Sequence, residues 1–526
     1  MLPAGITLVI LTVICAVLVP LFVCAPVTSD TSLFDVQAMT ALRGGVLYRD
    51  VIEPNLPGVV WIHMAVRSLV GWSSEAIRLF DLAVFLLTAC LLCSLVRRRE
   101  DSNADTHSSA IPGRLPLLLF VFLLLFYLTR NEWCHCQRDS WMLLPTACAL
   151  WLRCQRAQGS LPAVCSACAE GAFWGIAFWI KPHVAVPALA VMTVDRRRHH
   201  AWRDWLVDNA WVICGGVAAA IPGVVWLIVN GAWSHFWEMM LEWNPDYLEA
   251  GRQRRSLHRL SLMFQRFHPW GLIHLLAVPL ALVNIRRLWQ HRAADQLTGA
   301  AMASTDKRAV ISAVYLAWLW QTFLLQHAMD YIHVPEILLA MVVVAGFEWQ
   351  LDVAMRRGAV VFALALLTVM SPPLRPQRLL LWTRCLQEGS SPEIRAVLAQ
   401  GNFPDWEQLD RVQHFLREKQ VRDGDVTCFN VHSIHLHQQL GVLPATRYWT
   451  VLTPLTMFPR RFDQIMHTIT TSRHRYVVLE ERETSHQGQI HPAEFPREYP
   501  VVFEAGSYKV YQVPDQRTAT VPHPRR

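Results

Sequence analysis

Ionisable side chains interrupt the apolar part of this chain where five separate pairs of apolar segments are joined. They are Asp30, Asp35, Arg78, Asp81, Glu132, Arg138, Asp139, Lys181, His327, Asp330, Tyr331 and His333. Charges at membrane depth are costly, so they usually mark functional sites. A carboxylate can take a proton from a hydroxyl group, and a lysine or arginine can stabilise a phosphate. The common placement of these residues predicts that they meet in one polar cavity.

The apolar segments that must position these groups dominate the composition. The chain has 526 residues, of which 53% are hydrophobic and only 17% are charged. Apolar runs long enough to cross about 30 Å of hydrocarbon recur over the first 375 residues. We therefore expect a polytopic membrane protein. Its net charge of +7 is explained by an excess of arginine in cytoplasmic loops, and no basic patch interleaved with aromatic residues indicates a nucleic-acid partner.

Eleven segments are expected to be membrane helices. They lie near 5–25, 76–96, 115–130, 140–156, 163–180, 182–195, 207–230, 271–285, 309–327, 334–349 and 358–374. Residues 59–72 are apolar but short, and His63 and Arg67 share one helical face, as expected for a helix in the membrane interface. With that placement the arginine clusters, such as those at 97–99 and 196–198, all fall on the cytoplasmic side. The polar side chains described above then face the extracytoplasmic side.

The composition changes after Pro373, where long apolar runs end and charged residues increase. Short strand-like runs follow at 426–429, 476–479 and 508–513, with helix-like segments near 405–420 and 460–472. We expect a transmembrane domain over residues 1–374 and a small extracytoplasmic α/β domain over residues 375–526.

The polar segment after the first apolar helix carries the most informative motif. It contains Asp30, Ala38, Gly44, the triplet Tyr48-Arg49-Asp50 and Pro57. This spacing resembles the first extracytoplasmic loop of the GT-C superfamily of glycosyltransferases, which includes dolichyl-phosphate-mannose–protein mannosyltransferases and aminoarabinose transferases. The resemblance covers roughly residues 5–200. It departs from the family pattern at Thr31, where Glu is common, and at Leu56-Pro57, where the family has a pair of prolines.

The resemblance implies a multi-pass enzyme of the bacterial inner membrane that transfers a hexose or pentose. The donor would be a polyprenyl-phosphate sugar, and the acceptor a lipid, glycan or protein outside the cytoplasm. The family's catalytic base corresponds to Asp30, with Asp35 able to exchange roles with it, and a further acidic catalytic residue corresponds to Asp139. Lys181 would face the donor phosphate. The other substrate-binding candidates are Arg49, Asp50, Glu53, Arg138, His327, Tyr331 and His333.

A basic amphipathic stretch over residues 252–266 could hold the lipid phosphate or anionic membrane headgroups. Its arginines are Arg252, Arg254, Arg255, Arg259 and Arg266, interleaved with apolar and aromatic residues.

Ordinary structural roles compete with these assignments. Asp30 could cap an interfacial helix, and Lys181 could extend its ammonium group to the interface. Cys134-His135-Cys136 suggests a metal or redox site, but zinc sites normally need a second pair of ligands, and none is evident. No cofactor is required by the sequence. Asp30, Asp35 and Asp139 could nevertheless hold a divalent cation through oxygen ligands, so metal dependence stays open.

Two other functions compete with sugar transfer. A transporter or flippase of a lipid-linked sugar would carry polar residues near the bilayer midplane, commonly in two related halves. Here the polar residues cluster at one surface and no duplicated half is visible, which disfavours transport. A catalytically inactive GT-C-like subunit is the second alternative, because of the departure at Thr31. The identity of the sugar and acceptor, and the stereochemistry of transfer, are not encoded in any motif.

Overall fold

The computed structural model describes residues 4–96, 114–157, 161–195, 201–252, 264–265, 267–293, 300–327, 329–349, 352–486, 492 and 494–514. Two compact units are formed, and neither is continuous in sequence. The first comprises residues 1–23, 77–225 and 254–389, and the second comprises residues 24–76, 226–253 and 390–526. The second unit therefore combines the first loop with the C-terminal region. The sequence placed the start of that region at residue 375, whereas the units divide after Gly389.

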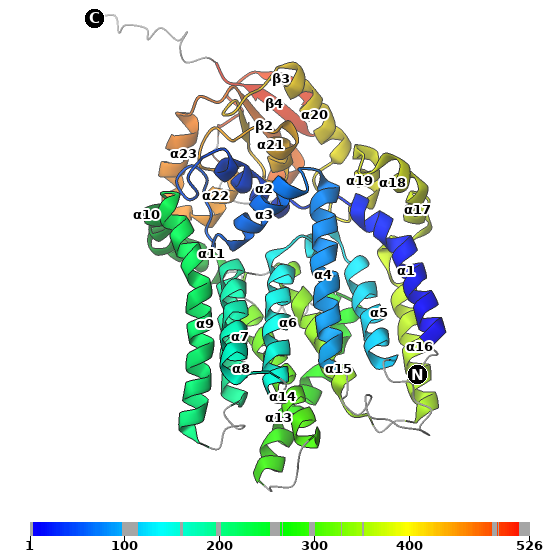
Figure 1. The fold of residues 1–526 in the computed structure, drawn as a ribbon. Coiled ribbons are helices and arrows are strands. Elements are labelled where there is room, and N and C mark those ends of the chain that lie inside the picture. The colour runs from blue at the N-terminus through cyan, green and yellow to red at the C-terminus, as the bar shows by residue number, and fades with distance from the viewer. Residues whose placement is uncertain are drawn as a thin grey trace, which may run out of the picture. The chain divides into compact units, whose positions relative to one another are not determined.

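The first unit is built from long apolar helices that run side by side (Figure 1). Its helices, some of which extend into the second unit, are α1 (Ala4–Cys24), α4 (Ser74–Val96), α5 (Arg114–Leu128), α6 (Arg138–Ala157), α7 (Ala163–Ile180), α8 (Ala185–Asp195), α9 (Trp202–Val229), α13 (His274–Ala293), α14 (Ala300–Leu325), α15 (Val334–Gly346), α16 (Val353–Val369), α17 (Pro376–Leu379) and α18 (Trp382–Glu388). Each of the eleven segments expected to be a membrane helix overlaps a helix, which confirms their helical structure but not that all eleven cross a membrane.

Length and hydropathy make six of the described helical segments suitable to cross a bilayer. They are Gly5–Cys24, Ser74–Val96, Ala163–Ile180, Trp202–Val229, Trp270–Gln290 and Thr305–Leu325. The short apolar segment after the first loop forms α3 (Gly58–Leu69). Its 12 residues extend only about 18 Å, which is less than the hydrocarbon thickness. This length agrees with the expectation of an interfacial helix.

Glycines bring α7 and α9 unusually close together. A Cβ atom on Gly171 would lie 1.8 Å from the carbonyl oxygen of Val212, and one on Gly215 would lie 1.9 Å from that of Cys168. Small residues of this kind allow membrane helices to pack backbone against backbone. The pair α7–α9 therefore depends on these two positions having no side chain.

The second unit contains a four-stranded sheet with the strand order β1-β2-β4-β3. The strands are β1 (Val426–Cys428), β2 (Tyr476–Glu480), β3 (Val501–Ala505) and β4 (Tyr508–Gln512). β1 and β2 are parallel, and the other pairs are antiparallel. The amphipathic helix α20 (Trp406–Glu418) covers the sheet, with Leu409 and Val412 packed in one core with Val478 and Val510. The expected α/β region is confirmed, although β3 was not predicted.

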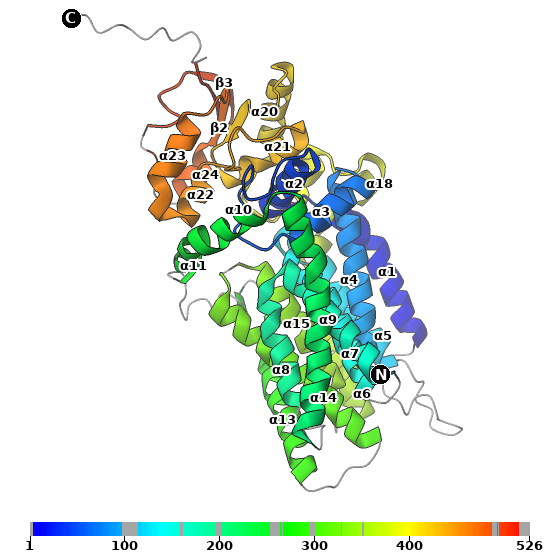
Figure 2. The same ribbon diagram turned by 60° about the vertical axis from the view of Figure 1, so that its left-hand side comes forward.

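Further helices complete the second unit (Figure 2). They are α2 (Ser29–Leu42), α3, α10 (Trp233–Glu238), a π-helix (Met239–Trp243), α11 (Asn244–Arg252), α19 (Pro392–Leu398), α21 (His435–Leu440), α22 (Leu452–Met457), α23 (Phe462–Thr470) and α24 (Glu481–His486). Helix α2, from the first loop, packs against α3 and also against α21 of the C-terminal region.

Candidate functional site

Asp30 lies in the first turn of α2, and Thr28 caps that helix. The Thr28 hydroxyl accepts a hydrogen bond from the backbone N–H of Thr31 at 3.3 Å, so Asp30 is not the N-cap residue. Ser29, Thr31 and Ser32 are buried, whereas Asp30 is partly exposed. The positive end of the helix dipole favours a charged carboxylate at this position. Asp30 is therefore the partly exposed acidic residue in the first turn of α2.

Asp35, one turn further along α2, is 1% exposed and is paired with α3. His63 Nδ1 lies 2.8 Å from Asp35 Oδ1. Arg67 donates from Nε to Oδ1 at 2.7 Å and from Nη2 to Oδ2 at 2.5 Å. Burial raises the pKa of Asp35, but hydrogen bonds and positive charge from His63 and Arg67 outweigh it and leave the pKa below its ordinary value. This carboxylate is charged and is already engaged by two partners.

The Tyr48-Arg49-Asp50 triplet builds a tight turn. Tyr48 has a φ of 71° and donates its hydroxyl hydrogen to the carbonyl oxygen of Asn55 at 2.9 Å. Arg49 donates to both oxygens of Asp50 at 2.8 Å, and the Asp50 carboxylate also accepts from the Val46 N–H at 2.7 Å. The hydrogen bond from Arg49 lowers the pKa of Asp50. These contacts give Asp50 a structural role in the turn.

Glu53 follows the turn and is fully buried. Its Oε1 accepts from the backbone N–H of Asn55 at 2.7 Å and from the Asn55 side-chain amide at 2.6 Å. Gln37 of α2 donates to the carbonyl oxygen of Ile52 at 3.0 Å. Hydrogen bonds therefore stabilise this loop internally, through Glu53 and Asn55, and connect it to α2 through Gln37.

A second polar cluster lies in the first unit, around Lys181. Lys181 follows α7, and its ammonium group donates to Asp139 Oδ1 at 2.7 Å and to Oδ2 at 2.8 Å. Asp139, in the first turn of α6, is fully buried, and Lys181 is 5% exposed. The ammonium also donates to Oε1 of Gln326, at the end of α14. The structure therefore brings two predicted site residues together, with a third partner that sequence reasoning missed.

The connection between α14 and α15 contains three further candidates of the first unit, His327, Tyr331 and His333. His327 precedes a short 3₁₀ helix, Tyr331–His333, which contacts both α6 and α15. His333 Nδ1 lies 2.9 Å from Oε2 of Glu336, a fully buried residue that was also missed. Glu336 therefore orients the imidazole of His333: because Nδ1 faces the carboxylate, Nε2 points away from it. The contact with α6 brings this connection to the end of the bundle that carries Arg138 and Asp139.

The Cys134-His135-Cys136 motif is a packed turn. His135 Nε2 lies 2.8 Å from the carbonyl oxygen of Tyr127, and Nδ1 lies 2.8 Å from Nη1 of Arg78. Because arginine can only donate, Nδ1 accepts and Nε2 donates, which defines a neutral imidazole. Among the described residues no group of three or more His, Cys, Asp or Glu side chains is arranged to hold a metal ion.

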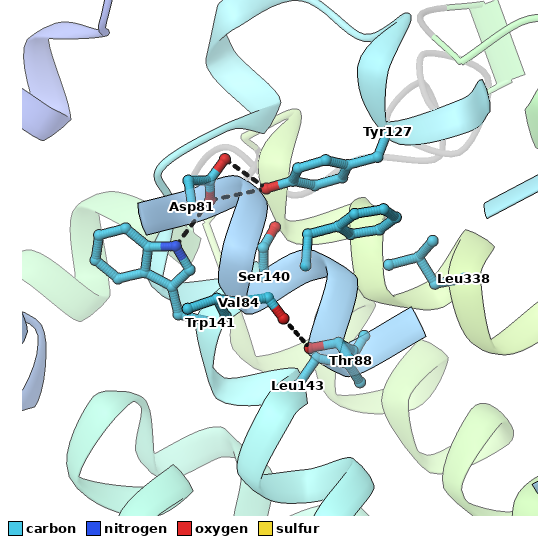
Figure 3. A pocket seen from close by; sticks show the side chains of 9 residues that line it. Asp81, Val84, Thr88, Tyr127, Ser140, Trp141, Leu143 and Leu338 are labelled. Atoms are coloured by element: carbon cyan, nitrogen blue, oxygen red, sulfur yellow. Dashed lines mark hydrogen bonds between the residues drawn. The ribbon is translucent and has the colours of Figure 1, made fainter. Parts of the chain in front are cut away.

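Asp81, within α4, is satisfied by neutral donors (Figure 3). Its carboxylate accepts from the Tyr127 hydroxyl at 2.9 Å and from Trp141 Nε1 at 2.8 Å. Tyr127 and Trp141 come from α5 and α6, so three helices meet at one buried carboxylate. This arrangement explains how a charged residue can occupy an apolar helix: its hydrogen bonds are made inside the bundle.

The predicted site residues are divided between the two units. Asp30, Asp35, Arg49, Asp50 and Glu53 belong to the second unit. Arg138, Asp139, Lys181, His327, Tyr331 and His333 belong to the first. Arg138 and Glu132 are nearly buried, at 8% and 7% exposure. A single cavity that joins both groups stays a prediction. Residues 253–263 and Arg266, from the basic stretch, lie outside the described residues.

The fold formed by these helices and the small C-terminal sheet is similar to that of a solved structure, ArnT. Among solved structures the chain is similar to ArnT from Cupriavidus metallidurans bound to undecaprenyl phosphate, with a TM-score of 0.54 and 13% identity over 100% of both chains. The apo state of that ArnT gives a TM-score of 0.51 at 13% identity, over 96% of this chain and 97% of ArnT.

AglB, an archaeal oligosaccharyltransferase from Archaeoglobus fulgidus in complex with an inhibitory peptide and a dolichol-phosphate, gives a TM-score of 0.47 at 9% identity. That match covers 90% of this chain and 69% of AglB. No family model and no curated protein matches the sequence. The two ArnT comparisons therefore establish the fold, although the sequence identity is only 13%.

Proposed function

We propose that this protein is a membrane glycosyltransferase that transfers a sugar from a polyprenyl-phosphate donor to a hydroxyl group on the extracytoplasmic side. The observation that carries the proposal is the similarity, over the full length of both chains, to an ArnT structure that holds undecaprenyl phosphate. Two polar clusters with complementary chemistry support it. The first loop contributes a partly exposed aspartate, Asp30, and the helix bundle contributes a buried ammonium group, that of Lys181.

Asp30 is the proposed base. Its carboxylate takes the proton of the acceptor hydroxyl while the hydroxyl oxygen forms a bond to the anomeric carbon of the donor sugar. The bond from that carbon to the phosphate oxygen breaks, and the electron pair leaves with the polyprenyl phosphate. Lys181 stabilises the negative charge of the departing phosphate. The partial exposure of Asp30, next to buried neighbours, suits a group that must meet a substrate.

Asp35 is proposed to position α2 rather than to act as the base. Both of its oxygens already accept hydrogen bonds from α3, and it is buried. A base must be able to reach the hydroxyl whose proton it removes. Asp139 is likewise proposed to orient Lys181, because both of its oxygens face that ammonium group.

The test uses full-length protein in liposomes with a radiolabelled polyprenyl-phosphate sugar and a mixture of extracted lipid, glycan and protein acceptors. Asp30→Asn is expected to reduce transfer at least 100-fold without lowering the melting temperature. Asp35→Asn is the matched comparison, and it is expected to lower the melting temperature because it weakens the pairing between α2 and α3. Normal transfer by Asp30→Asn would remove Asp30 from the mechanism. Wild-type protein that moves the donor across the bilayer without transferring sugar would establish a flippase.

The same proposal places the protein in the inner membrane of a bacterium, with residues 390–526 outside the cytoplasm. The supporting pattern is the sequence distribution of arginine clusters, such as Arg286-Arg287 and Arg356-Arg357, in segments that the positive-inside bias assigns to the cytoplasm.

A further inference from the structure

A directed chain of buried amides ends on Lys181. Gln326 accepts from the Lys181 ammonium group through Oε1 and donates through Nε2 to Oε1 of Gln321 at 2.5 Å. Gln321 in turn donates through its Nε2 to the hydroxyl oxygen of Thr322 at 3.1 Å. Gln326 is 3% exposed, and Gln321 and Thr322 are fully buried.

The direction of this chain is fixed by chemistry. An ammonium group only donates, so Gln326 must turn its carbonyl oxygen toward Lys181 and its NH₂ group toward Gln321. Gln321 must then present its own oxygen to Gln326 and its NH₂ group to Thr322. Rotating either amide by half a turn would oppose two donors or two acceptors in a buried place. Gln321 therefore holds Gln326 in the one orientation that can accept from lysine.

The chain also sets the charge around Lys181. Of the two hydrogen-bonding side chains described at the ammonium group, Asp139 contributes a carboxylate and Gln326 an uncharged amide. A glutamine therefore holds the lysine in place without adding a second negative charge beside it. An incoming phosphate would be repelled by a second carboxylate and is not repelled by an amide.

We propose that Gln326, held in orientation by Gln321, is a positioning residue that fixes the Lys181 ammonium group for the phosphate of the polyprenyl donor while keeping that position free of extra negative charge. This inference rests on the proposed function, because it assigns the phosphate to Lys181. It adds one requirement: the residue that directly follows α14, Gln326, must be an amide rather than an acid.

The experiment measures the affinity of full-length, detergent-solubilised protein for undecaprenyl phosphate, and the KM of the donor and of the acceptor in the transfer assay. The variants are Lys181→Ala, Gln326→Leu, Gln326→Glu and Gln321→Leu. The control is Asn284→Leu, which removes another buried amide of the same bundle. The side-chain amide of Asn284, in α13, donates to the Ser312 hydroxyl at 3.1 Å. Ser312 lies about 21 Å along α14 from Gln326.

Gln326→Leu is expected to weaken phosphate binding and raise the donor KM about tenfold, because a hydrogen bond to a charged group is lost. Gln321→Leu should give a smaller loss of the same kind. Gln326→Glu keeps the shape of the side chain and an oxygen facing the lysine, yet it should weaken binding more than Gln326→Leu does, since it adds a negative charge. The acceptor KM should stay within twofold throughout, and Asn284→Leu should leave both KM values unchanged.

The outcomes separate this inference from the proposed function. If wild-type protein does not bind undecaprenyl phosphate, the proposed function fails. If Lys181→Ala weakens binding but both Gln326 variants bind like wild type, the function stands and the positioning role is overturned. A Gln326→Glu variant that binds better than Gln326→Leu would overturn the charge requirement. Equal increases in donor and acceptor KM would show a general packing defect and would also overturn the role.

Discussion

The guanidinium group of Arg67 donates two hydrogen bonds to the carboxylate of Asp35, from Nε to Oδ1 at 2.7 Å and from Nη2 to Oδ2 at 2.5 Å. Arg67 also donates to the carbonyl oxygens of Gly71 and Ser73, at 3.1 and 2.7 Å. One buried arginine therefore fastens α2, α3 and the chain that follows α3. The helix that carries the proposed base is held at its second turn by this residue.

Removing one side of this pair should destabilise the protein strongly. Asp35→Leu or Arg67→Met alone is expected to lower the free energy of unfolding by about 3–5 kcal/mol, because the remaining charge stays buried without its partner. The double variant should recover much of that loss. Thermal unfolding of the solubilised protein provides the measurement, and a double variant less stable than both single variants would contradict the explanation.

The contact between α2 and α21 provides a second test of stability. Ser32 Oγ lies 2.7 Å from His435 Nδ1, and both residues are buried. Ser32→Ala should cost about 1–3 kcal/mol, because the imidazole nitrogen loses its partner. The comparison is Asp423→Ala, which removes the exposed contact from Arg43 Nη1 to both carboxylate oxygens and an exposed bond from the Leu443 N–H, and it should cost less than about 1 kcal/mol. Urea titration of both variants measures the difference, and a larger loss for Asp423→Ala would refute this ranking.

Acid should destabilise the C-terminal region in a defined pH range. Burial lowers the pKa of His432, His437 and His474 to about 4 each. In the unfolded chain these histidines become protonated near pH 6.5, but in the folded protein they do so only near pH 4. Their contribution to the free energy of unfolding is therefore fully present above about pH 6.5 and is lost as the pH falls from about 6.5 to about 4. The lowered pKa of Asp35 acts only below its ordinary value of 3.8, outside this range.

Tryptophan fluorescence during unfolding at a series of pH values would measure this effect. The variant His437→Asn should lose less stability than the wild type as the pH falls from 6.5 to 4, because one of the three histidines is removed. A wild-type protein whose stability is constant over that range would show that these histidines are protonated without penalty.

The close packing of α7 and α9 predicts a strong effect of a single methyl group. Gly171→Ala should cost about 1–3 kcal/mol, because a Cβ there would overlap the carbonyl oxygen of Val212 and the helices must separate. Gly358→Ala is the matched control, since no atom lies within 4 Å of its Cβ position and alanine favours the helix. Melting temperatures of the two variants provide the comparison. Equal values would show that α7 and α9 are not tightly packed.

The proposed orientation in the membrane can be measured with one added cysteine. Glu418→Cys, at the exposed end of α20, should react with a membrane-impermeant maleimide in intact spheroplasts. Wild-type protein, with its own 13 cysteines, provides the background reading. Labelling that occurs only after the membrane is opened would place the C-terminal region in the cytoplasm and contradict the proposed topology.

Much of the fold was predictable because it depends on local patterns. Apolar runs of sufficient length became helices, and the spacing of His63 and Arg67 correctly placed both on one face of α3, where both meet Asp35. The strand β3 was missed, since its five residues are mostly exposed or half-buried and lack a clear alternation.

The missed site residues have a different cause. Gln326 and Glu336 carry no motif, and their roles arise only from contacts with Lys181 and His333 in the folded bundle. A buried glutamine has the same sequence appearance whether it packs or accepts from an ammonium group. The Cys134-His135-Cys136 motif had a ligand-like composition, yet its histidine is occupied by Arg78 and Tyr127.

The union of residues 24–76 with residues 390–526 in one compact unit has a consequence for biogenesis. Ser32 emerges from the ribosome early, yet its partner His435 is made 403 residues later. The first loop therefore cannot complete its packing until residue 435 has been translated. A nascent chain halted before residue 435 would carry Asp30 on a helix that can pack against α3 but lacks its contact with α21.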